Sequence, residues 1–513
     1  MHRATTLSAR ARTLCISISV IVLSGCATTD FNVEKAESQA IAISQTTTLG
    51  QHTLAWHQQH GEHKSAFYPL KSGIDALGAR LRLIEAAEQS IDLQYFLMKD
   101  DIVGSLVSAK LLEAADRGVR VRFLLDDIFT SVTDNDLYLL DAHQNIEVRL
   151  FNPIARRGFK GLNYLGDFSQ ANRRMHNKSF TVDGSLTIVG GRNIAAEYFN
   201  LKQDAKFFDL DMLVKGAVVK EVAESFDQFW NHSKALPIEY LNNPPSSKAL
   251  EQVQNKIETV MQNAGTTVYQ TAIDSQLLND LIQQRIAEFI ASAYVISESP
   301  NKVDYSLNDD SIRLIKQIAE FMLQAEDNII IFTPYFIPTS QGMAFWQRVI
   351  DNGAQVSLVT NSLASTNHVP VHAAYEGYRK DLLAMGFNIY EARPDAAQII
   401  KAADQTSTLH TKLIIIDNRY VFVGSLNLDP RSVIINTEMG ILIDSSDLAE
   451  SILDDRDSIF ERVVYRLQLT ADRDIQWHGS DSGKAVILDT EPQTSWWRRL
   501  TAKLYKILPE GQL

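Results

Sequence analysis

The chain has 513 residues, of which 45% are hydrophobic and 22% are charged, a composition typical of a folded protein of two or three domains. Its formal net charge of −13 leaves no general excess of basic side chains for a phosphate backbone, so nucleic-acid binding is not expected to be its main task. Beyond residue 26, no run reaches the roughly 18 consecutive apolar residues of a spanning helix, which excludes an interior transmembrane helix.

The first 26 residues have the layout of a secretory signal. Three arginines precede an apolar run at 14–23 that is too short to span a bilayer, and Leu-Ser-Gly-Cys at 23–26 resembles a bacterial lipoprotein cleavage site. We therefore expect a signal peptide at 1–25, lipidation of Cys26, and a membrane-anchored lipoprotein of the cell envelope that faces the periplasm. Ala27 follows the cysteine where an aspartate would argue for the inner membrane, so the outer membrane is favoured. An ordinary signal peptide or a disordered start is the alternative.

Two stretches of the chain repeat one pattern of strand, helix and strand. The first copy comprises a predicted strand at 91–96, a helix at 103–117 and a strand at 119–125. The second copy comprises a strand at 329–336, a helix at 343–351 and a strand at 355–360. Strands that alternate with helices in this way predict an α/β fold, with a mixed or parallel sheet and helices on its faces.

Each half carries the same short motif after its repeated strands. Residues 176–183 read His-Asn-Lys-Ser-Phe-Thr-Val-Asp, and residues 410–417 read His-Thr-Lys-Leu-Ile-Ile-Ile-Asp. Six residues later, each copy has two small residues, a variable residue and an asparagine, at 190–193 and 424–427. One copy of H-x-K-x-x-x-x-D can arise by chance, but two copies with matching tails at the same offset are not accidental.

The motif brings together groups that suit a phosphodiester. Histidine and lysine two positions apart on a strand point to the same face, and small residues on the neighbouring strand leave room for a phosphate. Lysine, asparagine and hydroxyl groups would neutralise the charge on a pentacoordinate phosphorus, the electrostatic contribution that usually dominates such catalysis. The side chains expected to do so are Lys178, Asn193, Lys412, Ser425 and Asn427.

Two histidines, His176 and His410, allow a division of labour. One would attack phosphorus to give a phosphohistidine, and the other would protonate the leaving oxygen and then activate the acceptor. We favour His176 as the nucleophile and leave the reverse order open. The opposite ring nitrogen of a nucleophilic imidazole should be held by a carboxylate. Glu438, after the second motif, is placed to do so, and Asp209, preferred to Asp211 for its spacing, is its counterpart in the first half.

Other residues near the motifs receive structural or open interpretations. Asp183 and Asp417 close the motifs and are counted with the site, although we expect them chiefly to fix the turns that follow. His368 and His372 follow a strand end and could line the cleft, but a surface loop is the preferred interpretation. No cluster of His, Cys and acidic residues has the spacing of metal ligands, so neither a metal nor another cofactor is expected.

The duplicated motif with its G-[GS]-x-N tail resembles the signature of the phospholipase D superfamily. Within it, the chain is most similar to the C-type bacterial cardiolipin synthases, from about residue 65 onward. The segments that carry this resemblance are 172–183, 190–193, 360–364, 429–432 and 436–440. The resemblance implies two α/β lobes, each a mixed β-sheet flanked by helices, which are related by a pseudo-twofold axis and share one metal-free active site.

The same resemblance implies an activity: transfer of a phosphatidyl group, from phosphatidylethanolamine or phosphatidylglycerol, to phosphatidylglycerol through a phosphatidyl-histidine. The closest alternative is a phospholipase D, in which water takes the intermediate. A nuclease-type phosphodiesterase is less favoured because the chain is acidic, and a non-enzymatic envelope lipoprotein is less favoured because both motifs are intact. The expected partners are phospholipid substrates and a membrane surface, and the oligomeric state stays open.

These observations divide the chain into six parts. We expect a signal peptide at 1–25, an N-terminal tether at 26–64, a first lobe at 65–235, a connecting region at 236–310, a second lobe at 311–490 and a basic amphipathic tail at 491–513. In the tail, one predicted helical face is apolar and the other mostly basic, which suits the interface of an anionic membrane. Docking of this helix on the core of the protein is the alternative. The apolar face comprises Trp497, Leu500, Leu504, Ile507 and Leu508.

Overall fold

A computed structural model of the chain describes residues 29–155, 168–202, 205–241, 243–282, 285–286, 288–307, 313–399, 406–457, 460–481 and 484–513. The predicted signal peptide and Cys26 lie outside the described residues. Within the described ranges, no helix combines the length and the apolar character that crossing a bilayer requires.

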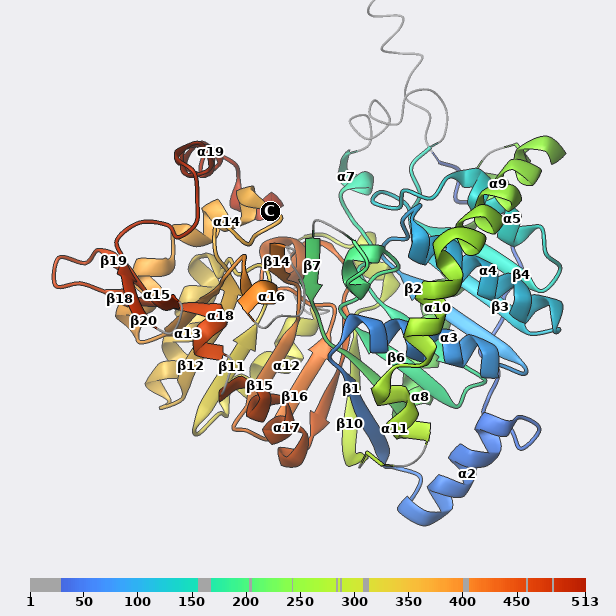
Figure 1. Cartoon of the computed structure of the whole chain (residues 1–513), viewed down its shortest axis with the longest axis horizontal. Coiled ribbons are helices and arrows are strands. Elements are labelled where there is room, and N and C mark those ends of the chain that lie inside the picture. Colours follow the sequence, from blue (N-terminus) through green and yellow to red (C-terminus); the bar gives the residue numbers. More distant parts are fainter. Residues whose placement is uncertain are drawn as a thin grey trace, which may run out of the picture.

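In the described part of the chain, 18 strands form a single sheet that runs through both halves (Figure 1). From the outer edge to the centre, the first half contributes β9 (Ala235–Pro237), β4 (Ile146–Phe151), β3 (Arg120–Asp126), β2 (Ser90–Tyr95), β5 (Ser179–Val182), β6 (Leu186–Gly190), β8 (Asp211–Gly216) and β1 (Ser65–Leu70). From the centre outward, the second half contributes β10 (Phe289–Ser297), β17 (Met439–Asp444), β16 (Tyr420–Gly424), β15 (Leu413–Ile416), β11 (Asn328–Phe332), β12 (Gln355–Asn361), β13 (Asn388–Ala392), β18 (Val464–Leu469), β19 (Ile475–Asp481) and β20 (Lys484–Leu488). A separate pair consists of β7 (Ala205–Phe208) and β14 (Thr406–Leu409).

The two halves have the same strand order outward from the centre, where β1 and β10 pair in antiparallel fashion with Phe67 opposite Phe289. A pseudo-twofold axis therefore passes between these two strands. One hydrophobic cluster crosses the junction and contains Phe67, Ala291 and Ile415, so the halves share part of their core. Because β10 pairs with β17, the sheet of the second half begins before the boundary expected at residue 311.

Helices cover both faces of the sheet. The helices of the first half are α3 (Gly73–Ala86), α4 (Ile102–Asp116), α5 (Asp134–Asp141), α7 (Phe168–Ala171) and α8 (Ala217–Trp230), preceded by α2 (Thr48–His60). Those of the expected connecting region are α9 (Ser247–Val260), α10 (Thr266–Ile273) and α11 (Gln276–Ile282), and they pack on α3, α4 and α5. Those of the second half are α12 (Leu314–Leu323), α13 (Thr339–Asp351), α14 (Val369–Glu376), α15 (Arg379–Met385), α16 (Ala396–Ile399), α17 (Ser446–Asp457), α18 (Phe460–Val463) and α19 (Trp496–Tyr505).

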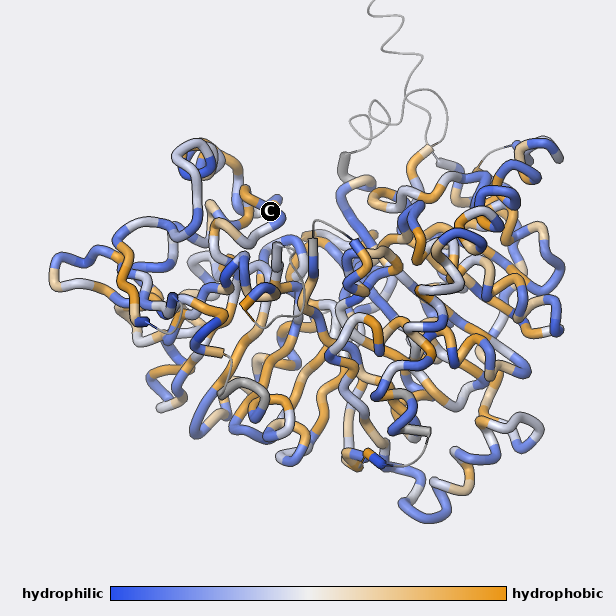
Figure 2. The backbone as a smooth tube through the Cα atoms, viewed as in Figure 1, coloured by the Kyte–Doolittle hydropathy of each residue, from blue (hydrophilic) through white to orange (hydrophobic). Residues whose placement is uncertain are grey.

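Strands such as β15 and β17 are buried along almost their whole length, which explains their unbroken apolar sequences. Along β3, Phe123 and Leu125 belong to the cluster under α3 and α4, whereas Leu124 belongs to the cluster under α8. Figure 2 shows the same arrangement, with hydrophobic colour along the central strands and hydrophilic colour on the outermost loops. The helix predicted at 103–117 is α4. It begins where the Asp101 side chain accepts the N–H groups of Val103 and Gly104.

The tail helix α19 docks on α14 through a face other than its apolar one. Ala502 is buried between Leu363 and Ala373, and the Arg498 guanidinium donates to the carbonyl oxygen of Leu363 at 2.7 Å. Most of the predicted apolar face is left in solvent, since Trp497 is 70% exposed, and Leu504, Ile507 and Leu508 are also exposed. The helix lies beside α14 at the edge of the second half in Figure 1.

Candidate active site

Two short backbone bridges join the halves, and in each one a bridged residue immediately precedes a motif histidine in the sequence. In the parallel pair β7–β14, Phe208 lies opposite Leu409. An isolated parallel bridge likewise sets Met175 opposite Thr437. In the first bridge, Asp209 follows one partner and His410 follows the other. In the second bridge, His176 follows one partner and Glu438 follows the other. The backbone therefore brings each histidine beside a carboxylate that is more than 200 residues away in the sequence.

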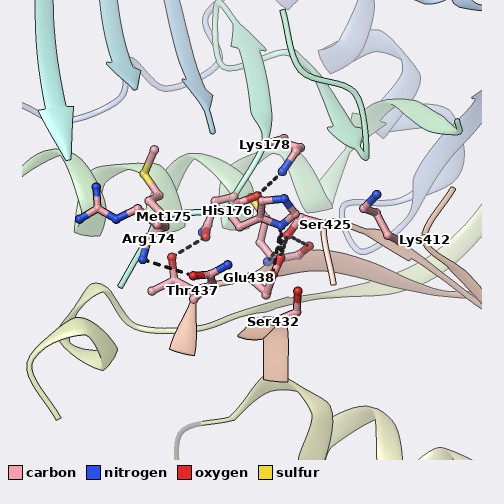
Figure 3. Close-up of polar contacts among 12 residues, drawn as sticks. Arg174, Met175, His176, Lys178, Lys412, Ser425, Ser432, Thr437 and Glu438 are labelled. Carbon is pink, nitrogen blue, oxygen red and sulfur yellow. Dashed lines mark hydrogen bonds and ion pairs between the residues drawn. The ribbon is translucent and has the colours of Figure 1, made fainter. Parts of the chain in front are cut away.

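Each motif histidine is bonded to a carboxylate from the other half. His410 Nδ1 lies 2.6 Å from Asp209 Oδ2, and His176 Nδ1 lies 2.9 Å from Glu438 Oε2 (Figure 3). All four side chains are buried. Asp211, the alternative to Asp209, is instead held by a buried arginine. Both acids predicted from the sequence contact a motif histidine. The sequence does not reveal the crossed pairing, in which each histidine contacts the acid of the other half.

The small residues at equivalent positions of the two tails meet the two acids differently. A Cβ at Gly191 would collide with the carboxylate of Asp209, so the first half has room only for glycine at this position. In the second half Ser425 occupies the equivalent place, and its hydroxyl donates to Glu438 Oε2 at 2.5 Å. Ser425 is therefore a partner of the carboxylate, and the phosphate contact expected of it from the sequence stays a prediction.

The two lysines fold back on their own motifs. Lys178 Nζ donates to the carbonyl oxygen of His176, and Lys412 Nζ donates to that of His410. Burial lowers the pKa of Lys178 to about 7 and the pKa of Lys412 to about 8. Burial and the neighbouring lysines also lower the pKa of His410 to about 4 and the pKa of His176 well below its ordinary value. Before an anionic substrate binds, burial and the lysines therefore favour the neutral form of both imidazoles near pH 7.

The two carboxylates carry unequal charge. Burial raises the pKa of Glu438 to about 7, an effect that Lys178 and a hydrogen bond from Ser425 only partly oppose. Burial also acts to raise the pKa of Asp209, but His410 and Lys412 outweigh it and hold that pKa below its ordinary value. The carboxylate beside His410 is therefore the more firmly ionised one, and His410 is the histidine better placed to hold a proton.

The paired histidines open onto a cavity of about 440 Å3 that Asn193 and Asn427 also line. The Asn193 amide donates to the Tyr198 hydroxyl at 3.0 Å, which fixes its orientation. The Asn427 Oδ1 atom is buried with no hydrogen-bond partner among the described residues, so it can accept a hydrogen bond from a ligand. The aromatic rings that border the cavity or the histidines are Phe96, Phe129, Tyr198, Phe207 and Tyr335.

Comparison with known proteins decides the family. The family model described as "Cardiolipin synthase, PLD-like domain" matches residues 81–230 and 318–462, the two halves that carry the motifs. The chain belongs to the phospholipase D superfamily. The predicted resemblance is thereby confirmed, and so is the predicted enzyme class, a phospholipase D-superfamily phosphatidyltransferase.

Similar proteins cover most of the chain. Cardiolipin synthase C of Escherichia coli (strain K12) is 39% identical over 451 residues, which are 86% of this chain and 94% of that protein. An uncharacterized protein of Helicobacter pylori (strain ATCC 700392 / 26695) is 33% identical over 97% of this chain and 99% of its own length. The solved structure of phosphatidylserine synthase from Haemophilus influenzae Rd KW20 matches with a TM-score of 0.52 and 16% identity, over 81% of this chain and 91% of that one. It confirms the predicted α/β fold.

The aspartates that close the two phospholipase D motifs lie at the far ends of β5 and β15 from the histidines. Asp183 accepts the backbone N–H groups of residues 88–90, and Asp417 accepts those of residues 326–328. Both have a positive φ, 50° and 52°, as a tight turn requires. Their position explains why these aspartates accompany the motif although they do not reach the cavity, whose lining does not include them.

Several neighbours of the cavity were missed or misjudged from the sequence. The preferred surface-loop interpretation is wrong for His372, which is buried in α14, and His368 lines the cavity, as the alternative proposed. Asp429 and Arg431 line it too, although the sequence offered only their place in a family-like segment. Within the described ranges, no three His, Cys, Asp or Glu side chains are grouped so as to hold a metal ion.

Proposed function

We propose that this protein is a cardiolipin synthase that transfers a phosphatidyl group, from phosphatidylethanolamine or phosphatidylglycerol, to a hydroxyl of phosphatidylglycerol. The observation that carries the proposal is the pair of buried histidine–carboxylate contacts facing one cavity beside two buried lysines. The 39% identity to cardiolipin synthase C supports the choice of product.

In the proposed first step, His176 Nε2 attacks the donor phosphorus. A nitrogen–phosphorus bond forms and the phosphorus–oxygen bond to the donor headgroup breaks. His410, whose imidazolium form is favoured by ionised Asp209 and by the bound phosphate, gives its Nε2 proton to the leaving oxygen and keeps its Nδ1–H on Asp209. Glu438 accepts the Nδ1–H of His176 and thereby leaves the Nε2 lone pair facing the cavity. Because Asp209 is the more firmly ionised acid, its partner His410 takes the proton-carrying role.

In the second step, His410 accepts the proton of a phosphatidylglycerol hydroxyl, and the resulting oxygen nucleophile attacks phosphorus. The nitrogen–phosphorus bond breaks, and His176 is restored. The ammonium groups of Lys178 and Lys412 and the amides of Asn193 and Asn427 would hold the phosphoryl oxygens through both steps. Water in place of the lipid hydroxyl would give phosphatidic acid, so exclusion of water separates a synthase from a hydrolase.

A second cavity supports a substrate with acyl chains. It measures about 340 Å3, adjoins the first cavity at Asp429, and has an apolar wall that includes Phe336, Ile337 and Trp346. Arginine and lysine side chains, among them Lys316, stand at its border. An apolar space with a basic border beside a phosphodiester site suits a phospholipid better than a nucleotide chain.

Membrane attachment belongs to the same proposal. The exposed apolar residues of α19 and of the segment that follows it, including Trp497 and Ile507, lie beside basic side chains, which suits insertion into an anionic interface. At the other end of the chain, the Thr29 hydroxyl donates to Pro153, just after β4. The lipid proposed on Cys26 would be tethered three residues from this point, in an envelope lipoprotein facing the periplasm.

The test uses purified protein with vesicles of labelled phosphatidylglycerol, with and without phosphatidylethanolamine, and with a chelator present. Products are resolved by mass spectrometry. Cardiolipin is the expected product, and ethanolamine release that depends on phosphatidylglycerol would identify the donor. The variants His176→Ala and His410→Ala should each abolish turnover while leaving the thermal unfolding transition nearly unchanged. Phosphatidic acid alone would make the protein a hydrolase, and substantial turnover in both variants would refute the two-histidine mechanism.

A further inference from the structure

The wall of the catalytic cavity contains a second group suited to an anion, on the side of residues 429–436. Arg431 lines the cavity together with His176 and His410. Its guanidinium donates to three oxygens: the carbonyl oxygen of Asn172 at 3.2 Å, the Oδ1 atom of Asn172 at 2.8 Å and the carbonyl oxygen of Gln512 at 2.9 Å. Both terminal nitrogens of the guanidinium thus donate to oxygen atoms of Asn172 and Gln512.

Two of the surrounding residues come from a short segment after α19. The Arg431 N–H donates to the main-chain oxygen of Leu513 at 3.0 Å, and the Asn172 amide donates to Gln512 Oε1 at 2.8 Å. Gln512 and Leu513 line the catalytic cavity themselves. Carbonyl oxygens of this segment therefore occupy donors that a phosphate would otherwise use, and they do so within the cavity wall.

The proposed reaction needs such a group. The donor phosphate is served by Lys178 and Lys412, but phosphatidylglycerol brings a second phosphodiester into the same cavity, and a buried anion without a cation is costly. The two phosphorus atoms of the product are separated by six bonds of the linking glycerol, which span about 7 Å when extended. A sphere of 440 Å3 is about 9 Å across, so both phosphates fit one cavity of this size.

We propose that Arg431, with Asn172, binds the phosphodiester of the acceptor lipid and so determines that the acceptor is an anionic phospholipid. This inference rests on the proposed synthase function. An arginine suits the task because its planar fork matches two phosphate oxygens at once. Gln512 and Leu513 give way when the acceptor binds. Asp429, which also lines the cavity, lies close by, and burial raises the pKa of its carboxyl to about 7, which weakens its opposition to a second anion.

The test compares two acceptors, phosphatidylglycerol and free glycerol, which offers the same kind of hydroxyl without a phosphate. In Arg431→Gln, the KM for phosphatidylglycerol should rise about 10- to 100-fold, with a smaller change in kcat, because a charge-assisted contact is lost. The kcat/KM ratio of phosphatidylglycerol to glycerol should fall by a similar factor. Arg431→Lys should recover part of the loss. Deletion of Gln512 and Leu513 should lower the KM for phosphatidylglycerol.

Arg419→Gln is the matched control, since Arg419 lies on the surface, paired with Asp444, in the turn between β15 and β16 at the end of these strands away from His410. An equal loss with both acceptors in Arg431→Gln, or an unchanged KM for phosphatidylglycerol, would overturn the inference. These outcomes are read against the wild-type protein. If the wild type makes no cardiolipin from phosphatidylglycerol, the proposed function fails. If it makes cardiolipin and Arg431→Gln behaves like Arg419→Gln, only the role of Arg431 fails.

Discussion

The crossed pairing of acids and histidines makes Asp209→Asn an informative perturbation. The amide keeps the shape of the carboxylate, but it removes the negative charge 2.6 Å from His410 Nδ1 and no longer favours the tautomer that exposes the correct ring nitrogen. The equivalent change in a serine-protease triad lowers turnover by about four orders of magnitude. We expect turnover of the natural lipid to fall by about 10^3- to 10^4-fold, which corresponds to about 4 to 5.5 kcal/mol of transition-state stabilisation.

A phosphatidyl p-nitrophenol substrate separates the two histidines. Its leaving group departs without a proton, so the first step needs the nucleophile but not the acid. If Asp209 serves His410, Asp209→Asn should still release a rapid burst of about one p-nitrophenol per enzyme, followed by very slow turnover. Glu438→Gln, the matched change beside His176, should show no rapid burst. If Asp209→Asn lost the burst while Glu438→Gln kept it, His410 would be the nucleophile. Equal loss in both variants would refute the assignment of one acid to each role.

Three further predictions concern the pH dependence of activity, the space beside Asp209 and binding to membranes. Glu438, with a pKa raised to about 7, must be ionised, whereas Lys178 and Lys412, with pKa values lowered to about 7 and about 8, must be protonated. Activity should therefore peak near pH 7 and fall on both sides, and a flat profile from pH 6 to 9 would contradict this. Gly191→Ala should displace the carboxylate of Asp209 and reduce turnover at least 100-fold, while circular dichroism shows that the fold is retained. Near-normal turnover would show that the site has more room than the geometry allows. Trp497→Ala should reduce the amount of protein that co-sediments with anionic vesicles several-fold, while hydrolysis of a soluble phosphodiester stays unchanged. Equal vesicle binding by the variant and the wild type would place the membrane contact elsewhere.

Much of the fold and of the candidate site could be predicted because the repeat constrains it. The strand order of one half recurs in the other, and the two motifs identify the same positions in each. The preference for Asp209 over Asp211 came from matching its spacing to that of Glu438, and Asp211 is instead paired with buried arginines.

The crossed pairing could not be predicted, because it depends on contacts between segments that are far apart in the sequence. The bridge between Phe208 and Leu409 joins residues about 200 positions apart, and neither sequence segment signals the other. β10 was assigned to the connecting region for a related reason. Its side chains alternate irregularly between buried and exposed positions, so its apolar pattern is weaker than that of β11 or β15.

The orientation of Ser425 could not be predicted either, because the motif gives the residue type but not the direction of the hydroxyl. A serine beside a phosphate site suggests a contact with the phosphate, whereas its hydroxyl is directed to Glu438. Arg431 was missed as a cavity residue because its place in the wall depends on the packing of Gln512, which lies 81 residues further along the chain.

The crossed bridges have a consequence for how the enzyme is made. While the chain leaves the ribosome, His176 is complete long before Glu438 has been synthesised, and Asp209 exists before His410. A nascent or truncated chain with only the first half folded therefore has no oriented histidine. In the proposed mechanism, chemistry on phosphodiesters therefore requires both halves to be docked, so fragments of this protein are expected to have no uncontrolled lipid-cleaving activity.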